Sequence, residues 1–433
     1  APLTLLPSGL LRAADQPKLQ IGFIGMGGQI QGHVKQALKL GHRITALCDV
    51  DQKQIEASQQ RHGEGVAKAT IYQDYRKLFE KEKSMDAVVI ATPDHWHAPI
   101  CRAAFAAGKH IYCEKPLTHT VAEARQMREL CKSSGVITQM GNQGSASSNL
   151  RRSMELIAAD LFGQISSIHV WHPAHGWPSG IDRPDDTDTV PNGLNWDFWL
   201  GPAPVRPYKS SIYHPAKWRG WYDFGNGSLG DFCCHSFNLP LRALNLDYPK
   251  RIEVSGEGLG KESYAKSCTT RLHFPARGER AEVSLNYYTG GDLPDETITH
   301  DVSATFGGLP RVGCILVGEK GHLAAGLWNS QCYVKLKGDA KYMGADNHEA
   351  AKTIPHTLPR VKNHLQEWAD ACLGGPKNFA DFEHGGHLTE IGLAGNVALR
   401  MQQNIEWDGP NMKVINHPEA DQFIRHEDRT QWL

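Results

Sequence analysis

The chain has 433 residues, of which 40% are hydrophobic and 21% charged, so it is long enough to bury a sizeable core and to divide into two domains. Its 46 basic and 47 acidic side chains nearly balance and form no long run of one sign, so neither a nucleic acid nor a membrane surface is expected as a partner. No stretch approaches the roughly 18 consecutive apolar residues of a membrane-spanning helix. The composition favours a globular protein that acts on a small, neutral molecule.

The ten cysteines are irregularly spaced and include no CxxC pair, so most are expected to be buried thiols and no metal site is predicted. Residues 1–17 begin without Met and are rich in small and apolar residues, as is typical of the remnant left when an export leader is removed. These residues are interpreted as an N-terminal arm of an exported, periplasmic protein, with a cytoplasmic protein as the alternative.

Residues 18–140 alternate short apolar runs with amphipathic stretches, the pattern of βαβ units around a parallel sheet. Helix signals punctuate the runs, including Asp51 as an N-cap and Thr120 with Glu123 as a capping box. We expect a doubly wound Rossmann domain here. Its predicted strands cover 19–24, 44–47, 87–91, 110–113 and 136–140, and its helices begin near 30, 51, 99 and 120.

Residues 141–433 change in character and predict a second, α+β domain with an open, mostly antiparallel sheet. A Pro-, Gly- and Trp-rich stretch over 173–230 shows little periodicity, and loops of that length in compact proteins are usually functional or disordered. Its aromatic content argues against disorder. The predicted strands of this domain cover 165–171, 251–255, 271–274, 281–288 and 315–317, and the predicted helices cover 365–373 and 388–401.

A glycine-rich turn joins the first predicted strand to the first helix, where backbone amides and the helix dipole can meet a pyrophosphate. The third glycine of the dinucleotide fingerprint is missing, because Ile30 stands in its place. Asp49 follows the second strand, where a carboxylate can accept hydrogen bonds from the adenosine ribose and would repel a 2′-phosphate, so NAD is favoured over NADP. The predicted cofactor-binding residues of this region are Gly25, Gly27, Gly28, Gln29, Ile30 and Asp49.

Two further segments, Thr92-Pro-Asp-His-Trp-His97 and Ala107-Gly-Lys-His-Ile-Tyr-Cys-Glu-Lys-Pro116, resemble the Gfo/Idh/MocA family, named for glucose-fructose oxidoreductase, inositol dehydrogenase and a rhizopine-catabolism protein. The resemblance spans nearly the whole chain. It implies that Glu114 contacts the cofactor, that Lys115 reaches the reacting hydroxyl, and that a cis bond precedes Pro116. It also places Thr92, Pro93, His95, His97 and Asn142 near the cofactor. Without the resemblance, Lys115 could equally be a solvated lysine at a strand end.

The segment Gly225-Asn-Gly-Ser-Leu-Gly-Asp-Phe-Cys-Cys-His235 resembles the second motif of that family. Asp231 and His235 are four residues apart at a helix start, so their side chains share one face. We expect them to meet the substrate together with Lys115, with His235 as a general base and Asp231 orienting it. A surface Asp–His pair is the alternative. Asn238 departs from the Asp that many members carry, which puts a substrate contact at that position in doubt.

Six of the 11 tryptophans lie between residues 171 and 221, just before this motif. Flat aromatic faces suit the apolar faces of sugar rings, although the same residues could simply fill the core of the second domain. The predicted substrate-binding residues are Lys115, Trp218, Trp221, Tyr222, Asp231, His235, His172 and Arg152.

These features predict an NAD-dependent oxidoreductase that transfers hydride from a hydroxyl of a sugar, glycoside or polyol. A glycosidase that keeps NAD bound and oxidises, eliminates, hydrates and reduces in turn is the alternative, and a non-catalytic NAD-binding sensor is a third possibility. The family resemblance also implies a homo-oligomer that pairs through the open face of the second sheet.

Overall fold

The short apolar runs of the first third of the chain form a six-stranded sheet in which every pair of neighbouring strands is parallel. The computed structural model describes residues 17–173, 175–426 and 429, so nearly all of the predicted N-terminal arm lies outside the described residues. The strand order, β3-β2-β1-β4-β5-β6, is that of a doubly wound dinucleotide-binding fold. The strands are β1 (Gln20–Ile24), β2 (Arg43–Cys48), β3 (Thr70–Tyr72), β4 (Ala87–Ile90), β5 (His110–Glu114) and β6 (Thr138–Gly141).

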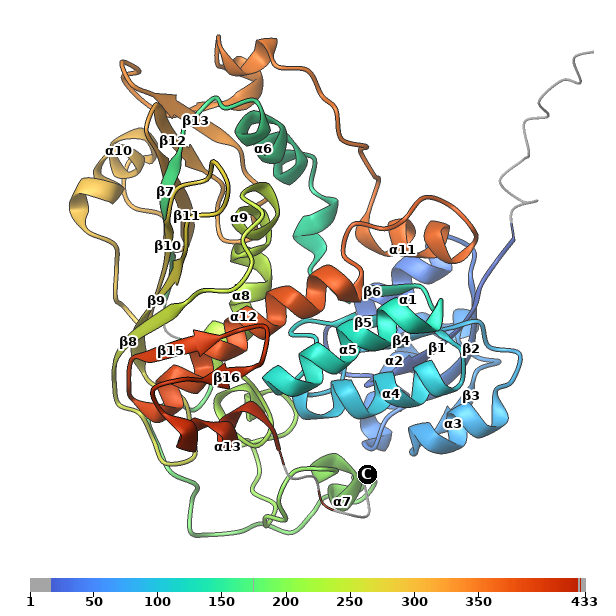
Figure 1. Ribbon diagram of the computed structural model, residues 1–433. Helices are drawn as coiled ribbons and strands as arrows, with labels where there is room; N and C mark the ends of the chain where they lie inside the picture. Colours follow the sequence, from blue (N-terminus) through green and yellow to red (C-terminus); the bar gives the residue numbers. More distant parts are fainter. Residues whose placement is uncertain (1–16, 174, 427–428, 430–433) are drawn as a thin grey trace, which may run out of the picture.

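Helices cover both faces of this sheet (Figure 1). Two of them start at the predicted capping signals: the Asp51 side chain accepts a hydrogen bond from the amide of Lys53, and Thr120 and Glu123 form a complete capping box. Each such cap stabilises its helix by about 1 kcal/mol. The helices are α1 (Ile30–Lys39), α2 (Gln52–His62), α3 (Tyr75–Lys81), α4 (His97–Ala106) and α5 (Val121–Ser134).

The second sheet has ten strands in the order β14-β13-β12-β11-β7-β10-β9-β8-β15-β16. Only β7 and β10 pair in parallel among the described strands, so the prediction of a mixed, mostly antiparallel sheet is confirmed. The strands are β7 (Ile165–His172), β8 (Arg251–Glu257), β9 (Ser267–Phe274), β10 (Val283–Thr289), β11 (Gly313–Gly318), β12 (Gly321–Ala324), β13 (Tyr333–Leu336), β14 (Met343–Gly344), β15 (Ile405–Asp408) and β16 (Lys413–Val414).

A long central helix, α12 (Phe382–Met401), lies between the two sheets and packs against α5 and α8 (Figure 1). It begins six residues earlier than predicted. Its first turns contain Gly385 and Gly386, which lower helix propensity, yet a Cβ on Gly385 would lie 2.8 Å from Cβ of Met140, so close packing requires the glycine. The other helices of this half are α6 (Ser148–Ala158), α7 (Trp196–Leu200), α8 (Gly227–Ser236), α9 (Asn238–Ala243), α10 (Glu296–Phe306), α11 (His364–Cys372) and α13 (Asp421–Ile424).

Helix α11 returns from the second half of the chain to the first sheet. Its Leu365 and Trp368 are buried in one cluster with Phe23 and Tyr112 of β1 and β5. All ten cysteines are free thiols and none is exposed, as predicted. Within the described ranges, no helix combines the length and apolar character that crossing a bilayer would require.

Candidate active site

A cavity of about 540 Å³ lies where β1, β2, β4 and β5 end, and its size suits a small-molecule or cofactor site. Gly25, Gly27 and Gly28 form one wall. Gly25 has φ +86°, and a Cβ there would lie 2.8 Å from the carbonyl carbon of Ala91, so the turn requires glycine. A Cβ on Gly27 or Gly28 would meet nothing within 4 Å, so the backbone at these positions faces open space. This cradle fits the pyrophosphate of a dinucleotide.

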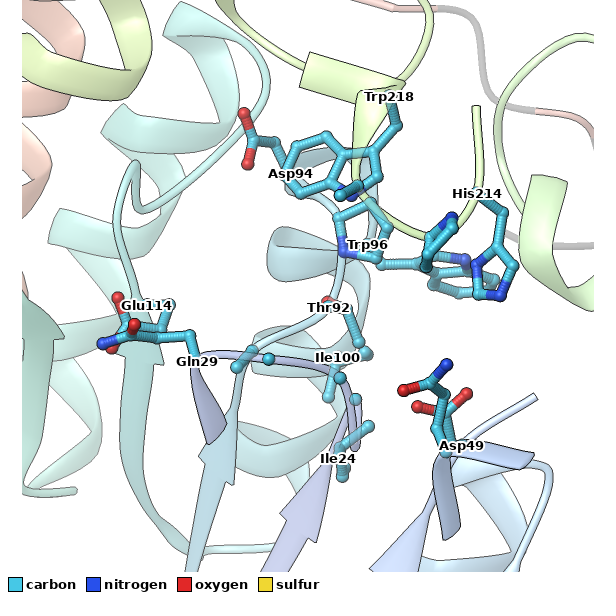
Figure 2. Close-up of a pocket in the computed structure, with 18 of the residues that line it drawn as sticks. Ile24, Gln29, Asp49, Thr92, Asp94, Trp96, Ile100, Glu114, His214 and Trp218 are labelled. Carbon is cyan, nitrogen blue, oxygen red and sulfur yellow. The ribbon is translucent and has the colours of Figure 1, made fainter. Parts of the chain in front are cut away.

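Asp49 lines the cavity immediately after β2 (Figure 2). Its Oδ2 accepts a hydrogen bond of 2.5 Å from the amide of Met26, and its Oδ1 accepts one of 2.8 Å from the amide of Asp51. Burial outweighs these hydrogen bonds and raises the pKa of Asp49 to about 7. The carboxyl group therefore ties the glycine turn to the start of α2 while it faces the cavity.

The opposite end of the cavity carries a buried ion pair. The Nζ of Lys115, just after β5, lies 2.9 Å from Oδ2 of Asp231 and donates to the backbone oxygen of Asp231 at 3.0 Å. Nε of Arg219 donates to Oδ1 of the same carboxylate at 3.2 Å. Burial would raise the pKa of Asp231, but Lys115 and Arg219 outweigh it and the pKa falls to about 2. The Lys115–Pro116 bond is cis, as predicted.

His235 lies one turn after Asp231 on α8 and lines the same cavity. Burial, and next the charge of Lys115, lower the pKa of His235 to about 3, so the ring is neutral near pH 7. Its Nδ1 has no hydrogen-bond partner among the described residues. The structure thus brings Lys115, Asp231 and His235 together, as the sequence predicts.

Glu114 also faces the cavity, at the end of β5 (Figure 2). Its Oε1 lies 2.5 Å from Nε2 of His33 and accepts a hydrogen bond of 2.8 Å from Gln143. These partners hold the carboxylate beside Lys115. Thr92 and Pro93, which follow β4, and Gln29 line the cavity as well.

A strap formed by residues 193–219 lines part of the cavity. The amide of Asn195 donates to the carbonyl of Val50 at 2.9 Å, the amide of Gln52 donates to the carbonyl of Gly193 at 3.0 Å, and Nε2 of His214 lies 2.8 Å from Oδ2 of Asp51. The strap is thus joined to the start of α2 at several points. His214 and Trp218 project over the cavity in Figure 2. The strap is therefore held against the segment that follows Asp49.

Four residues predicted near the cofactor support the site from outside the cavity wall. His97 bridges the carbonyls of Pro116 at 2.7 Å and Thr92 at 3.0 Å, and His95 bridges those of Trp199 at 3.0 Å and Phe224 at 3.3 Å. Ile30 is buried in the core beneath the glycine turn. Asn142 is also buried, and its Nδ2 donates to the carbonyl of Cys234 at 3.4 Å.

Trp218 lines the cavity, whereas four other predicted substrate residues do not. Trp221 is fully buried and donates to the carbonyl of Ile212, and Tyr222 donates to the carbonyl of Gly260. His172 stacks on Phe232, with ring centroids 3.9 Å apart. Arg152 is buried and donates to the carbonyl of Ala351 at 2.5 Å. Asn238 is likewise buried and bonds to Ser145.

The sequence does not predict several of the residues that line the cavity, although two of them, Asp94 and Trp96, lie inside the Thr92–His97 motif. Asp94 is 1% exposed, and burial followed by repulsion from Asp231 raises its pKa well above the usual range. Phe232 lies beneath Lys115, whose Nζ is 5.5 Å from the ring centroid. Trp328, 44% exposed, lies beside His235 with ring centroids 6.3 Å apart.

Two family models match the chain. The oxidoreductase family model for the NAD-binding Rossmann fold covers residues 19–142, and its companion model for the C-terminal alpha/beta domain covers residues 164–273. The chain belongs to the Gfo/Idh/MocA oxidoreductase family. A family-wide Rossmann domain that binds a nicotinamide dinucleotide agrees with the glycine cradle and with Asp49.

Curated relatives of this Gfo/Idh/MocA chain include a glycosyl hydrolase family 109 protein of Shewanella pealeana, 27% identical over 286 residues, which covers 64% of this chain and 54% of the relative. The alpha-N-acetylgalactosaminidase of Shewanella oneidensis is 25% identical over 299 residues, 66% of this chain and 57% of the relative. The chain thus spans somewhat more than half the length of these relatives.

Solved structures share the fold over nearly the whole chain. The WlbA dehydrogenase of Bordetella pertussis, in complex with NADH and UDP-GlcNAcA, has a TM-score of 0.63 at 18% identity and covers 90% of this chain and 98% of its own. The aldose-aldose oxidoreductase of Caulobacter crescentus has a TM-score of 0.60 at 16% identity, with coverage of 90% and 100%. At these identities the likeness establishes the two-domain architecture.

Proposed function

We propose that this protein is an NAD-dependent oxidoreductase that removes hydride from a carbon bearing a hydroxyl group in a sugar, glycoside or polyol. One observation carries the proposal: the Lys115–Asp231 ion pair and His235 line the same cavity as the glycine cradle and Asp49. Nucleotide binding and proton transfer therefore share one enclosed space. A pure NAD sensor would have no need of this buried proton-transfer set.

Gly25, Gly27 and Gly28 would hold the pyrophosphate, and Asp49 would hold the adenosine ribose. The choice of NAD over NADP is supported by the charges that line the cavity. Among the described lining residues the only Lys or Arg side chains are Lys115 and Arg219, and both bond to Asp231. A 2′-phosphate would meet Asp49 and Asp74 without a cation to balance it.

When bound, the nicotinamide supplies the acceptor for a hydride, that is, for two electrons and one proton. The protein handles the remaining proton. The Lys115 ammonium has three N–H donors, of which two point to Asp231, so the third remains to hold the substrate oxygen. The neutral His235 ring can take the hydroxyl proton at Nδ1, and the carbon–oxygen double bond forms as the hydride leaves.

A glycosidase that reduces its own ketone product and keeps NAD bound is the second candidate. The glycosidase names of the curated relatives favour it, and so does the strap, whose bonds to Val50 and Asp51 hold it against the end of the cavity that Asp49 lines. A trapped cofactor suits a reaction in which every hydride removed is returned within the same cycle.

The first test is to denature the purified protein without added cofactor and to measure the dinucleotide released per chain. Near-stoichiometric NAD supports the retained-cofactor glycosidase, whereas an empty protein that reduces added NAD with a sugar supports the exchanging dehydrogenase. Lys115→Met should lower kcat by about 10²- to 10⁴-fold while nucleotide still binds. Full activity of Lys115→Met would exclude the proposed site.

A homo-oligomer is proposed through the outer face of the second sheet. Polar side chains occupy this face of the central strands, with Arg271 bonded to Asn286 at 2.7 Å, while Leu285 and Tyr287 of β10 face the core and are fully buried. Light scattering with chromatography tests the assembly, and replacing Arg271 with Glu should dissociate it. A monomeric wild-type protein would contradict the proposal.

A further inference from the structure

A buried carboxyl group on the cavity wall has no part in the hydride-transfer scheme. Asp94 begins the short 3-10 turn Asp94–Trp96 after β4, and 1% of its surface is exposed. Its Oδ2 accepts a hydrogen bond of 3.0 Å from Nδ2 of Asn226, which also donates to the carbonyl of Thr118 at 3.1 Å. Its Oδ1 has no hydrogen-bond partner among the described residues. One oxygen is thus an acceptor and the other is left to carry a proton.

The charges around Asp94 favour its protonated form. Asp231 repels a second negative charge, and the nearby cations, Lys115 and Arg219, are already bonded to Asp231. Tyr264 and the Cys113 thiol also face Asp94. Burial raises the pKa of both, so they stay neutral and add no charge beside Asp94. Asp94 is therefore buried, and the cations near it form ion pairs with Asp231 instead.

Two carboxyl groups beside one cavity thus have pKa values that are shifted in opposite directions. Burial raises the pKa of Asp94 well above the usual range, whereas Lys115 and Arg219 hold that of Asp231 at about 2. Such a divergence between neighbouring groups is typical of sites that divide acid and charge-stabilising roles between them. In Figure 2 the Asp94 side chain lies on the side of the cavity that carries Glu114 rather than Asp49.

We propose that Asp94 is a further catalytic residue, a carboxylic acid that gives its Oδ1 proton to the oxygen of a departing group on a glycoside substrate. This inference rests on the proposed function, since the substrate hydroxyl must first be oxidised to a ketone by the bound dinucleotide. A proton donor of this kind is required when the departing group is a poorly acidic alcohol, such as a second sugar or an alkyl group.

The step balances without a further oxidant. His235, after releasing the hydroxyl proton to water, takes a proton from the carbon beside the ketone, and the electron pair of that C–H bond becomes a carbon–carbon double bond. The bond to the departing oxygen breaks, its electron pair stays on the oxygen, and the Asp94 proton joins that oxygen. Asp94 is left as a carboxylate and regains a proton from water.

The matched test is Asp94→Asn in the holoenzyme, since an amide keeps the shape and the hydrogen bond to Asn226 but donates no acidic proton. The probes are the methyl and 4-nitrophenyl glycosides of glucose and of N-acetylgalactosamine. We expect kcat/KM for the methyl glycoside to fall by about 10²- to 10⁴-fold, with a far smaller fall for the nitrophenyl glycoside, whose departing phenolate needs no acid. Equal losses on both probes would indicate a structural role and overturn the inference.

A second readout does not depend on turnover. The infrared spectrum of the wild-type holoenzyme at pH 7 should contain a carbonyl band of a protonated carboxyl group that is absent from Asp94→Asn. If that variant does not fold, nuclear magnetic resonance of wild-type protein with carbon-13-labelled aspartate should reveal a carboxyl that stays protonated above pH 7 and is distinct from Asp49. An ionised Asp94 at pH 7 in either measurement overturns the inference.

Failure of the two proposals can be told apart. A wild-type protein that reduces its dinucleotide with a free sugar but cleaves none of the four glycosides keeps the proposed oxidoreductase function and overturns the role of Asp94. A wild-type protein that neither binds the dinucleotide nor oxidises a sugar overturns the proposed function, and the inference with it.

Discussion

Asp49→Asn should make the nucleotide-free protein more stable at alkaline pH while it weakens nucleotide binding. Burial raises the pKa of Asp49 from 3.8 to about 7, which corresponds to at most ~4 kcal/mol for holding the ionised group in the folded protein. Asparagine carries no charge, so the variant does not have this free-energy cost. It also loses one of the two acceptors that now serve the amides of Met26 and Asp51, at a cost of about 1 to 3 kcal/mol. The gain therefore exceeds the loss where Asp49 is ionised.

The sign of the pH dependence follows from proton binding. Between about pH 4 and pH 7 the unfolded chain has released the Asp49 proton while the folded chain keeps it, so the free energy of unfolding of the wild type falls as pH rises and levels off above pH 7. Asp49→Asn lacks this dependence. The stability difference in favour of the variant should therefore grow by about 2 to 3 kcal/mol between pH 5 and pH 8.

Urea denaturation of the nucleotide-free wild type and variant at pH 5 and pH 8 measures this stability difference. NAD titration of the same samples should show that the variant binds about 10- to 100-fold more weakly, because it loses a charge-assisted hydrogen bond to the ribose. A stability difference that is the same at both pH values would refute the reasoning, because it would mean that Asp49 ionises alike in the folded and unfolded chain.

Three further substitutions test the cradle, the strap and the contact between the domains. Gly25→Ala should lower the free energy of unfolding by about 1 to 3 kcal/mol, because the φ of residue 25 is +86° and a Cβ there would strike the Ala91 carbonyl. Gly27→Ala has open space around its Cβ, so this variant should fold normally and lose only nucleotide binding. The melting temperature and the bound nucleotide per chain distinguish the two variants. His214→Ala removes the bond to Asp51 and should speed nucleotide release by about three- to tenfold in a chase experiment, and an unchanged rate would show that the strap does not retain the nucleotide. Glu390→Gln leaves Arg125 and Arg128 without their fully buried carboxylate and should cost about 3 to 5 kcal/mol in urea denaturation, whereas a loss below 1 kcal/mol would show that the ion pairs are dispensable.

The first sheet and its site could be predicted because their signals are local. The glycine turn, the acidic residue after β2, and the capping box at Thr120 each depend on neighbouring residues, and each is present in the structure. The convergence of Lys115 with Asp231 could be predicted only from the family resemblance, since the two are 116 residues apart and no spacing rule brings them together.

What escaped prediction depends on contacts between distant segments. Arg152 is buried by Ala351, 199 residues away, and Trp221 is buried within an irregular segment whose sequence has little periodicity. Their residue types alone therefore do not reveal that they lie away from the cavity. Asp94 stands in a recognised motif, yet its burial becomes visible only when α8 brings Asn226 and Asp231 beside it. The short strands β14 and β16, of two residues each, are too brief to produce a periodic pattern.

The strap links nucleotide retention to the protonation states of the site. Trp218 and His214 line one side of the cavity, and a site from which side chains exclude water has stronger charge interactions. The same burial raises the pKa of Asp94 and lowers that of His235, whereas Asp231 stays ionised because two cations contact it. Loosening the strap should therefore move the pKa of Asp94 toward its ordinary value as well as release the nucleotide. His214→Ala examined by both readouts would separate a strap that only retains the nucleotide from one that also sets the acid–base chemistry.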